Sequence, residues 1–224
     1  MKAIKYGITV TLLKENDLEL VRNWRNNPLV VQNYEFRDYI TAEMQKEWFS
    51  TINNIHNLYT IFEYRGEKVG VINLKNIDWE KREFEGGIFI ADPKFHKTAL
   101  PAILSYMTTE IQFLLFGWDS GYAHVLKENV ATQQFIRSLG FELCEGQEEV
   151  NNQRWVNTRA SFERRTARLK KAIALISEDN ASQFVIEPDE FDNPLVLQWE
   201  ALVRKNMKPD RVEETSAGRI YHFT

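Results

Sequence analysis

Residues 129–141 read NVATQQFIRSLGF, a stretch that carries its own start and stop signals for a helix. Asn129 belongs to the best class of residues for capping a helix N-terminus, and Gly140 is typical of the position just after a helix ends. These two residues predict a helix over residues 130–139. Apolar residues on either side predict short strands over residues 122–127 and 141–144. The stretch therefore indicates a strand–helix–strand unit.

Residues 84–93 read FEGGIFIADP, and their apolar run predicts a strand over residues 84–91. Gly86 and Gly87 lie in the middle of this pattern and indicate either a bulge or a close approach of another backbone. Pro93 ends the pairing because proline has no N–H to donate. A long helix is expected over residues 99–116.

The other elements of the first 163 residues follow the same two periodicities. Strands are predicted over residues 8–13, 58–64, 69–74 and 154–162, and helices are predicted to begin at Asn16 and Thr41. The resulting order is one strand, two helices, three strands, a helix, a strand, a helix and two strands. We therefore expect an α/β fold with a mixed, mostly antiparallel sheet flanked by helices.

The character of the chain changes near residue 163. We expect one domain over residues 1–163 and a small α+β extension over residues 164–224. The extension has too much apolar content for a disordered linker and is too short to bury a strong core alone. We expect it to dock on residues 1–163, a second subunit being the alternative. The face expected to be buried consists of Leu195, Trp199, Leu202 and Val203.

Composition limits the classes of function. The chain has 224 residues, a net charge of −4 and one cysteine, Cys144. The acidic balance makes nucleic acid an unlikely main partner, and a lone cysteine excludes an internal disulfide and fits a reducing compartment. The N-terminal residues lack the apolar core of a signal peptide, and no apolar run reaches the ~20 residues that span a bilayer. We expect a cytoplasmic protein without a membrane partner, and a homodimer stays open.

Three stretches together resemble the GNAT N-acetyltransferase superfamily, and most closely its RimJ/RimL-like branch of ribosomal-protein and amino-sugar acetyltransferases. The first runs over residues 17–28, with NWRN at 23–26, and continues with Ile40-Thr41 and Trp48-Phe49. The second is residues 85–93, and the third is residues 129–141, which is similar to the family's last helix. The resemblance covers residues 8–162 and implies a GNAT-like sheet.

The resemblance implies an acyltransferase that moves an acetyl group from acetyl-CoA, as co-substrate, to a primary amine by direct attack. The acceptor would be a protein N-terminus, an amino sugar or a small amine. The alternative is a catalytically degenerate GNAT-fold protein that serves in binding or assembly. Departures from the family's motifs favour that alternative.

The main departure lies in the loop that holds the CoA pyrophosphate in the family, where an Arg/Gln-x-x-Gly-x-Gly/Ala motif is usual. His96 stands at the first position, Ala99 at the first glycine and Pro101 at the second. Helix N-terminal N–H groups can still bind an anion without glycine. The residues expected to contact CoA are Phe89, Ile90, Ala91, His96, Lys97, Thr98, Ala99, Leu100 and Asn129.

Glu85 matches the position at which several GNAT enzymes carry a glutamate that acts as general base. An amine acceptor is protonated at neutral pH, so attack on a thioester requires removal of a proton. Glu83 has the same parity on the strand and is the rival candidate. An oxyanion-binding N–H is expected near Phe89 or Ile90. The family's general-acid tyrosine has no counterpart, because Ile136 occupies its position.

The four histidines are His56, His96, His124 and His222, and none lies at a metal-ligand spacing from another His, Cys or carboxylate. We therefore predict no metal site. Cys144 follows a strand pattern and is interpreted as a small buried hydrophobe.

Overall fold

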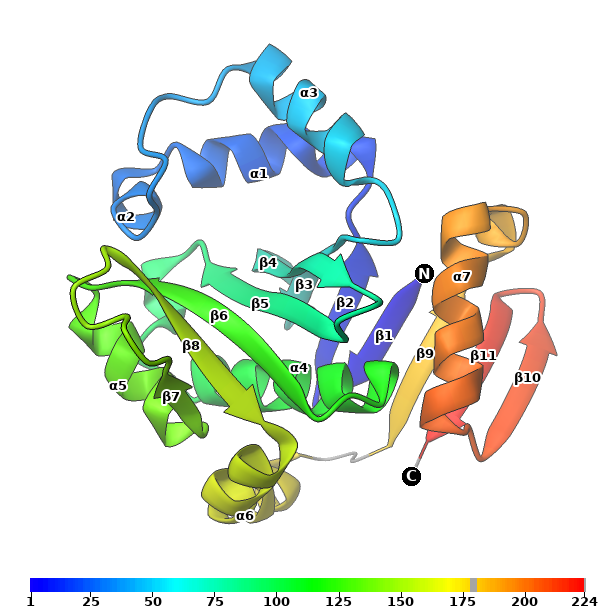
Figure 1. The fold of residues 1–224 in the computed structure, drawn as a ribbon. Coiled ribbons are helices and arrows are strands. Elements are labelled where there is room, and N and C mark those ends of the chain that lie inside the picture. Colours follow the sequence, from blue (N-terminus) through cyan, green and yellow to red (C-terminus); the bar gives the residue numbers. More distant parts are fainter. Residues whose placement is uncertain (178–180, 224) are drawn as a thin grey trace.

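In the computed structural model, which describes residues 1–177 and 181–223, eleven strands form one sheet with the order β10-β11-β9-β1-β2-β3-β4-β5-β6-β8-β7 (Figure 1). Every neighbouring pair is antiparallel except β5 and β6, which are parallel. The strands are β1 Lys2–Lys5, β2 Ile8–Leu12, β3 Leu58–Tyr64, β4 Glu67–Asp78, β5 Glu83–Ile90, β6 Ser120–Leu126, β7 Phe141–Leu143, β8 Asn152–Thr158, β9 Ser182–Ile186, β10 Arg211–Thr215 and β11 Gly218–Phe223. The expected mixed, mostly antiparallel sheet is confirmed.

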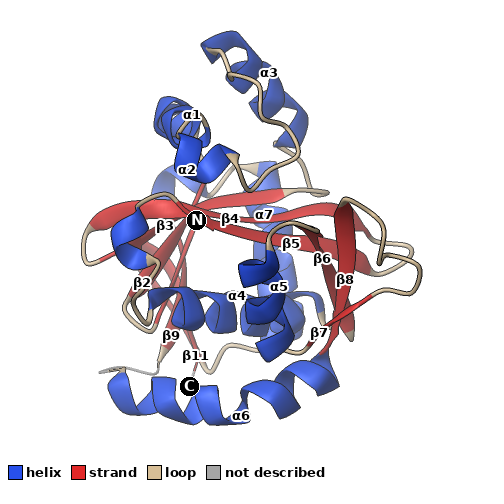
Figure 2. Ribbon diagram, turned by 90° about the vertical axis from the view of Figure 1, so that its left-hand side faces the viewer, coloured by secondary structure: helices blue, strands red, loops and turns tan. Residues whose placement is uncertain are grey.

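Helices cover both faces of this sheet, and Figure 2 shows α1–α3 on the side opposite α4. The helices are α1 Leu18–Arg25, α2 Pro28–Val31, α3 Ala42–Ile52, α4 Leu100–Phe116, α5 Val130–Ser138, α6 Arg159–Ile176 and α7 Pro194–Leu202. Because successive side chains of a strand point to opposite faces of the sheet, each face has its own hydrophobic core. Ile61 and Val71 face α1 and α3, whereas Phe62 and Ile72 face α4.

Local chemistry explains most helix ends. Thr41 caps α3 by accepting the N–H of Met44 at 3.2 Å, and Gly117 ends α4 at a φ of 63°. The helix predicted to begin at Asn16 begins instead at Leu18, and Asn16 does not cap it. Asn16 lies inside a short 3₁₀ turn, Glu15–Asp17, and the carboxylate that closes the turn belongs to Asp17, which accepts the N–H of Lys14 at 3.1 Å.

Three other expectations need correction. Strand β1 was not predicted, because Lys2–Lys5 is short and alternates charged with apolar residues. The strand expected over residues 154–162 ends at Thr158, whose hydroxyl caps α6 by accepting the N–H of Ser161 at 3.2 Å. Residues 159–162 are therefore helical, and residue 163 falls inside α6.

The third correction concerns Gly86 and Gly87. The β4–β5 register runs unbroken past both glycines, and its irregularity lies on β4 between Lys75 and Asp78. Neighbouring side chains leave little room for a Cβ at either position. A Cβ on Gly87 would lie 2.9 Å from the Asn73 side chain, and one on Gly86 would lie 3.3 Å from that of Gln112.

The C-terminal segment extends the same sheet. Strand β9 pairs with β1, and β11 pairs with β9. Helix α7 contributes Val196 and Trp199 to a buried cluster that also contains Leu74 and Phe116 of the preceding residues. Leu195 and Leu202 are partly buried against this cluster, and Val203 is 2% exposed.

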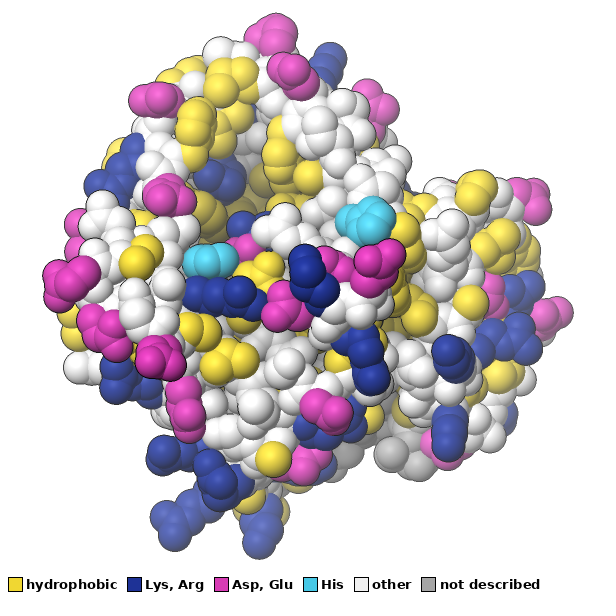
Figure 3. Space-filling view, in the orientation of Figure 1, with side chains coloured by type: hydrophobic (Ala, Val, Ile, Leu, Met, Phe, Trp, Pro, Cys, Tyr) yellow, Lys and Arg dark blue, Asp and Glu magenta, His cyan; other side chains and the backbone are white. Residues whose placement is uncertain are grey.

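Helix α6 projects from the molecule with a basic outer face, visible at the lower edge of Figure 3. Its exposed cations are Arg164, Arg165, Arg168, Lys170 and Lys171. Within the described ranges, no helix is long and apolar enough to cross a bilayer.

We expect Trp199→Ala to lower the free energy of unfolding by about 3–5 kcal/mol, the usual cost of removing a buried aromatic ring. Trp199 is 1% exposed and its ring lies 6.4 Å from that of Phe116. Urea unfolding followed by circular dichroism measures the change. Leu175→Ala is the control, because Leu175 is 87% exposed and its loss should change little. An effect of Trp199→Ala no larger than that of the control would contradict the packing.

Candidate functional site

The candidate site lies where β5 and β6 separate. These parallel neighbours share one register pair, Glu85 with Tyr122, and no pair joins the later residues of β5 to β6. On its other edge β5 pairs with β4 continuously from Glu85 to Ile90. The sheet is therefore open along one side of β5, from Glu85 towards the N-terminus of α4.

Backbone parity decides which groups of β5 face this opening. The N–H of Ala91 donates to the carbonyl of Val69 on β4 at 2.8 Å. Alternation along an antiparallel pair then directs the backbone groups of Phe89 to β4 as well, and those of Ile88 and Ile90 to the open side. The carbonyl of Ile90 is met there by Nε2 of His96 at 3.0 Å.

Of Phe89, Ile90 and Ala91, which were expected to contact CoA, only Ile90 directs its N–H into the opening. Ile88, which sequence reasoning did not name, directs its N–H the same way. The side chain of Phe89 faces α1–α3, where its ring lies 6.2 Å from that of Trp24.

Glu85 lies at the vertex, where the two strands part, and it is 5% exposed. Three side chains from three strand positions meet its carboxylate. Lys75 Nζ lies 2.9 Å and His124 Nδ1 3.2 Å from Oε1, and Asn76 Nδ2 donates to Oε2 at 2.9 Å. Burial alone raises the pKa of the Glu85 carboxyl, but the hydrogen bond from His124 and the charge of Lys75 outweigh burial and hold the pKa below its ordinary value.

A bulge on β4 places Asn76 in this cluster. Lys75 pairs with Glu85 and Asp78 pairs with Glu83, so two residues of β4 oppose one of β5. Asn76 takes a φ of 53°, in the left-handed region that asparagine tolerates better than most residues. The bulge lets consecutive residues, Lys75 and Asn76, both reach Glu85.

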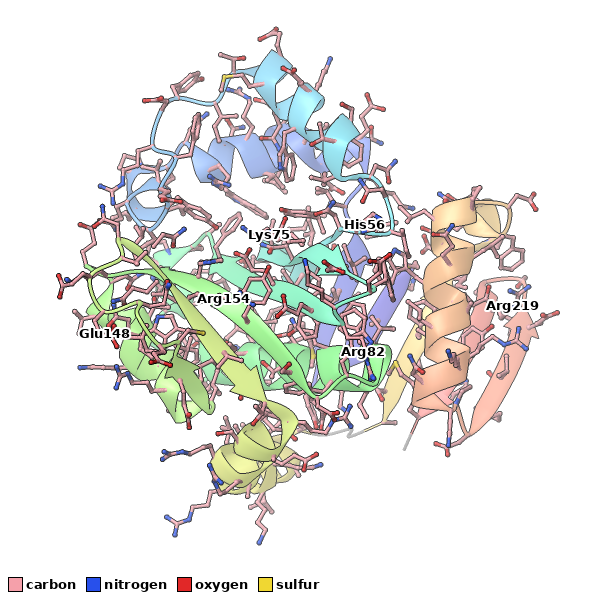
Figure 4. All side chains as sticks on the ribbon, viewed as in Figure 1. His56, Lys75, Arg82, Glu148, Arg154 and Arg219 are labelled. Carbon is pink, nitrogen blue, oxygen red and sulfur yellow. The ribbon has the colours of Figure 1, made fainter. Side chains whose placement is uncertain are left out.

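The rival carboxylate is differently placed. Glu83 is 42% exposed at its side chain and pairs with Arg154 Nη2 at 3.1 Å. The guanidinium of Arg154 also lies 4.1 Å from the ring centroid of Tyr122. Figure 4 shows Lys75 and Arg154 over the middle of the sheet, from β4 and β8 respectively.

Aromatic side chains form the roof and floor of the hollow between α1–α3 and the sheet, which Figure 3 shows from its open side. Tyr34 and Trp24 both meet the edge of Phe89 at 6.2 Å, and Trp48 meets Tyr59 at 5.0 Å. Burial raises the pKa of Tyr59 to about 12, and the charge of Glu85 adds to the shift. The phenol of Tyr59 is therefore neutral and able to donate at physiological pH.

The loop after α2 closes one end of this hollow by reaching across to β6, α5 and β8. Asn129 Nδ2 donates to Asn33 Oδ1 at 3.1 Å, while its own Oδ1 caps α5 by accepting the N–H of Thr132 at 3.1 Å. Arg37 pairs with Glu128. Asn129 thus caps α5 and also anchors the loop after α2 through Asn33. Ile136 of the same helix packs in a cluster with Trp155, so α5 brings no phenol to the opening.

The N-terminus of α4 lies at the other end of β5. In the part of the chain that the structure describes, the N–H groups of Lys97, Ala99 and Ala102 have no hydrogen-bond partner. The N–H of Leu100 is taken by Thr98 Oγ1 at 3.2 Å, and the Leu100 side chain is 2% exposed. Lys97, Thr98 and Ala99 are exposed. Three free donors therefore surround the positive end of a long helix.

These features form one continuous surface. Glu85 and Ile90 mark the two ends of the open edge of β5, about 16 Å apart at ~3.3 Å per residue, and the loop to the α4 N-terminus follows Ile90. The sequence analysis named Glu85, the loop and Asn129 as site residues, and it did not name Lys75, Asn76 or His124, which meet Glu85 in the structure. Over residues 1–177 and 181–223, no group of three or more His, Cys, Asp or Glu side chains could hold a metal ion.

Comparison with known proteins identifies relatives of this chain. Residues 8–142 match the family described as an acetyltransferase (GNAT) domain. An uncharacterized protein of Methanocaldococcus jannaschii is 26% identical over 145 residues, which make up 60% of this chain and 28% of that relative. The match thus spans less than a third of the relative's length.

Solved structures share the fold at low identity. A domain from Methanocaldococcus jannaschii has a TM-score of 0.59 at 20% identity, covering 67% of this chain and 97% of that one. A spermidine N-acetyltransferase from Vibrio cholerae, in complex with CoA and spermine, has a TM-score of 0.62 at 19% identity, covering 70% and 98%. An aminoglycoside acetyltransferase, AAC(6')-Ib in complex with coenzyme A, has a TM-score of 0.59 at 19% identity, covering 70% and 98%.

We expect Lys75→Met to raise the pKa of the Glu85 carboxyl, because burial is then opposed by one cation fewer. With a lowered pKa, ionised Glu85 stabilises the folded state above the unfolded-state value near 4.3, and this contribution is lost as the pH falls through the folded pKa. The ¹³C shift of the carboxyl against pH measures the midpoint. Lys94→Met is the control, since Lys94 pairs with Glu67 elsewhere at 2.6 Å. An unmoved midpoint in Lys75→Met would contradict the assignment.

Proposed function

The chain belongs to the GNAT acetyltransferase family, and from this premise we propose that it transfers the acetyl group of acetyl-CoA to a primary amine by direct attack. The observation that carries the proposal is the opening beside β5, with free donors along its edge and a buried carboxylate at its vertex. The acceptor is a protein N-terminus, an amino sugar or a small amine. The NWRN stretch at residues 23–26 supports the RimJ/RimL-like branch, and the lone cysteine supports a cytoplasmic setting.

The residues at the α4 N-terminus fit a pyrophosphate. The free N–H groups of Lys97, Ala99 and Ala102 point from a helix N-terminus, which favours an anion, and the Lys97 ammonium adds charge. The small, exposed Ala99 leaves room for close approach. Acetyl-CoA would lie along the open edge of β5 from this loop towards Glu85, with Asn129 on the opposite wall.

The N–H groups of Ile88 and Ile90 supply the electrostatic part of catalysis. They face the opening, fixed by a strand that β4 holds on its other edge. Donors that are already oriented stabilise the negative charge that develops on the thioester oxygen without reorganising at the moment of reaction. The aromatic hollow under α1–α3 would hold the acceptor next to this point, so that rate is gained by juxtaposition of the two substrates.

The proposal is tested by measuring CoA release from acetyl-CoA with a panel of peptides, amino sugars and polyamines, beside a thermal-shift scan with acetyl-CoA. Binding at 100 times Kd stabilises the folded state by about 2.7 kcal/mol. The alternative, a degenerate binding or assembly protein, is favoured by the two missing loop glycines. Stabilisation by acetyl-CoA without CoA release for any acceptor would support that alternative.

We expect Ala99→Phe to abolish acetyl-CoA binding by filling the space in front of the free N–H groups. Ala201→Phe is the matched control, because Ala201 is exposed on α7, outside the site. Isothermal titration measures both affinities. Equal acetyl-CoA affinity in Ala99→Phe and Ala201→Phe would remove the pyrophosphate from this loop.

We expect Glu85→Gln to lower kcat by ~10²-fold while the affinity for acetyl-CoA stays nearly unchanged, because proton removal from the amine depends on this carboxylate. Glu83→Gln is the matched control, since it removes the exposed carboxylate on the same face of β5 and should leave kcat within twofold. Steady-state kinetics measure both. A larger loss in Glu83→Gln would exchange the two roles.

A further inference from the structure

We propose that Nε2 of His124 is the atom that accepts the proton of the acceptor amine, and that Glu85 is the positioning residue that holds the imidazole in place. The inference rests on the proposed function and deepens it by naming the proton acceptor. The contact between His124 on β6 and Glu85 on β5 joins residues 39 positions apart, which no local pattern predicts.

One ring nitrogen of His124 is fixed by a carboxylate, and in the described part of the chain the other ring nitrogen is free. His124 lies on β6 two residues after Tyr122, the last point at which β6 is paired with β5, so it stands where the opening begins. Its Nδ1 lies 3.2 Å from Glu85 Oε1, and its side chain is 31% exposed. Among the described residues, Nε2 has no partner.

The hydrogen bond decides the tautomer of the ring. Because a carboxylate can only accept, Nδ1 must carry the proton, and in the neutral ring the lone pair is then on Nε2. The free, partly exposed nitrogen is therefore the one that can take a proton. The ring also meets Tyr122 edge-on, at 5.6 Å and 87°, which limits its rotation.

Glu85 itself is poorly disposed to accept a proton. Oε1 is shared by Lys75 and His124, and Oε2 is bonded to Asn76. Three of its roughly four acceptor sites are occupied and the residue is 5% exposed, which leaves little room for a substrate ammonium. A carboxylate so well satisfied is a weak base, and general-base catalysis is most efficient when the base titrates near the working pH, as imidazoles do.

Charged and titratable groups surround the imidazole on each side. Glu85 comes from β5, Lys75 from β4 and Arg154 from β8, directly opposite His124 in the β6–β8 register. Tyr122 lies on the same strand and Glu83 pairs with Arg154. Glu85 contacts the ring directly, so its carboxylate balances the positive charge of the ring once a proton has been accepted.

The step balances without another reagent. The acceptor ammonium gives one proton to Nε2, which returns it to solvent. The amine nitrogen forms a bond to the carbonyl carbon of the thioester, and the C–S bond breaks with its electron pair on sulfur. The second amine proton ends on the CoA sulfur. Ammonium and thioester thus yield amide, thiol and one released proton.

The test uses His124→Asn, whose amide can keep a donor near the position of Nδ1 but offers no base. We expect kcat to fall by ~10²-fold with an unchanged KM for acetyl-CoA. The acid limb of the kcat/KM profile between pH 5 and 8 should disappear. His222→Asn is the matched control, because His222 also faces a glutamate, Glu213 at 3.3 Å, but on the C-terminal hairpin. It should leave kcat within twofold.

Two further measurements separate a proton acceptor from a structural part. The double variant Glu85→Gln/His124→Asn should be no slower than the worse single variant, because residues that act as one unit are not additive. ¹⁵N spectra of the neutral imidazole should show the proton on Nδ1 in the wild type and should lose that preference in Glu85→Gln.

An unaltered kcat and pH profile in His124→Asn, or a wild-type ring protonated on Nε2, would overturn the assignment while leaving acetyl transfer intact. A wild-type protein that releases no CoA with any acceptor would overturn the proposed function, and this assignment with it.

Discussion

Strands β5 and β6 are joined by a single register pair, Glu85 with Tyr122, while β5 is paired to β4 without interruption from Glu85 to Ile90 on its other edge. The full edge holds β5 rigid, and the open edge leaves its alternate N–H groups without partners from the sheet. The same alternation sends Glu85 and Phe89 towards α1–α3 and Ile88 towards α4. One separation between two strands therefore produces a row of donors on one side and a polar vertex beneath an aromatic hollow.

The vertex would be less organised without the irregularity in β4. In a regular strand Lys75 and Asn76 would point to opposite faces of the sheet. The extra residue of the bulge, with Asn76 at a φ of 53°, turns both side chains to the carboxylate. Glu85 is thereby held ionised and immobile although it is 5% exposed. An immobile, satisfied carboxylate is better suited to orient a neighbour than to exchange protons itself, which is why its pairing with His124 matters.

Local signals in the sequence predicted most elements, because caps, turns and apolar periodicity act over a few residues. The strand predicted over residues 58–64, the long helix predicted over residues 99–116 and the cap at Asn129 are of this kind. Features that depend on contacts between distant strands could not be predicted in this way. Gly86 and Gly87 indicated a bulge or a close approach of another backbone, whereas the structure places the side chains of Asn73 and Gln112 against them, from elements distant in the sequence. Likewise, His124 and Glu85 are 39 positions apart and meet only because β6 lies beside β5.

The loop over residues 96–101 lacks the glycines of the family's motif, and its backbone conformation shows whether glycine is required there. Glycine is required where φ is positive or where a side chain would block a ligand. No residue over 96–101 has a positive φ, and Ala99 takes a right-handed conformation at a φ of −72°. Pro101 lies in the first turn of α4, where an N–H has no intrahelical partner, so its ring removes one donor without disturbing the helix. The loop and the first turn of α4 thus keep three free donors with one small side chain in front of them, and their backbone requires no glycine, although Pro101 lacks the donor that a glycine would supply.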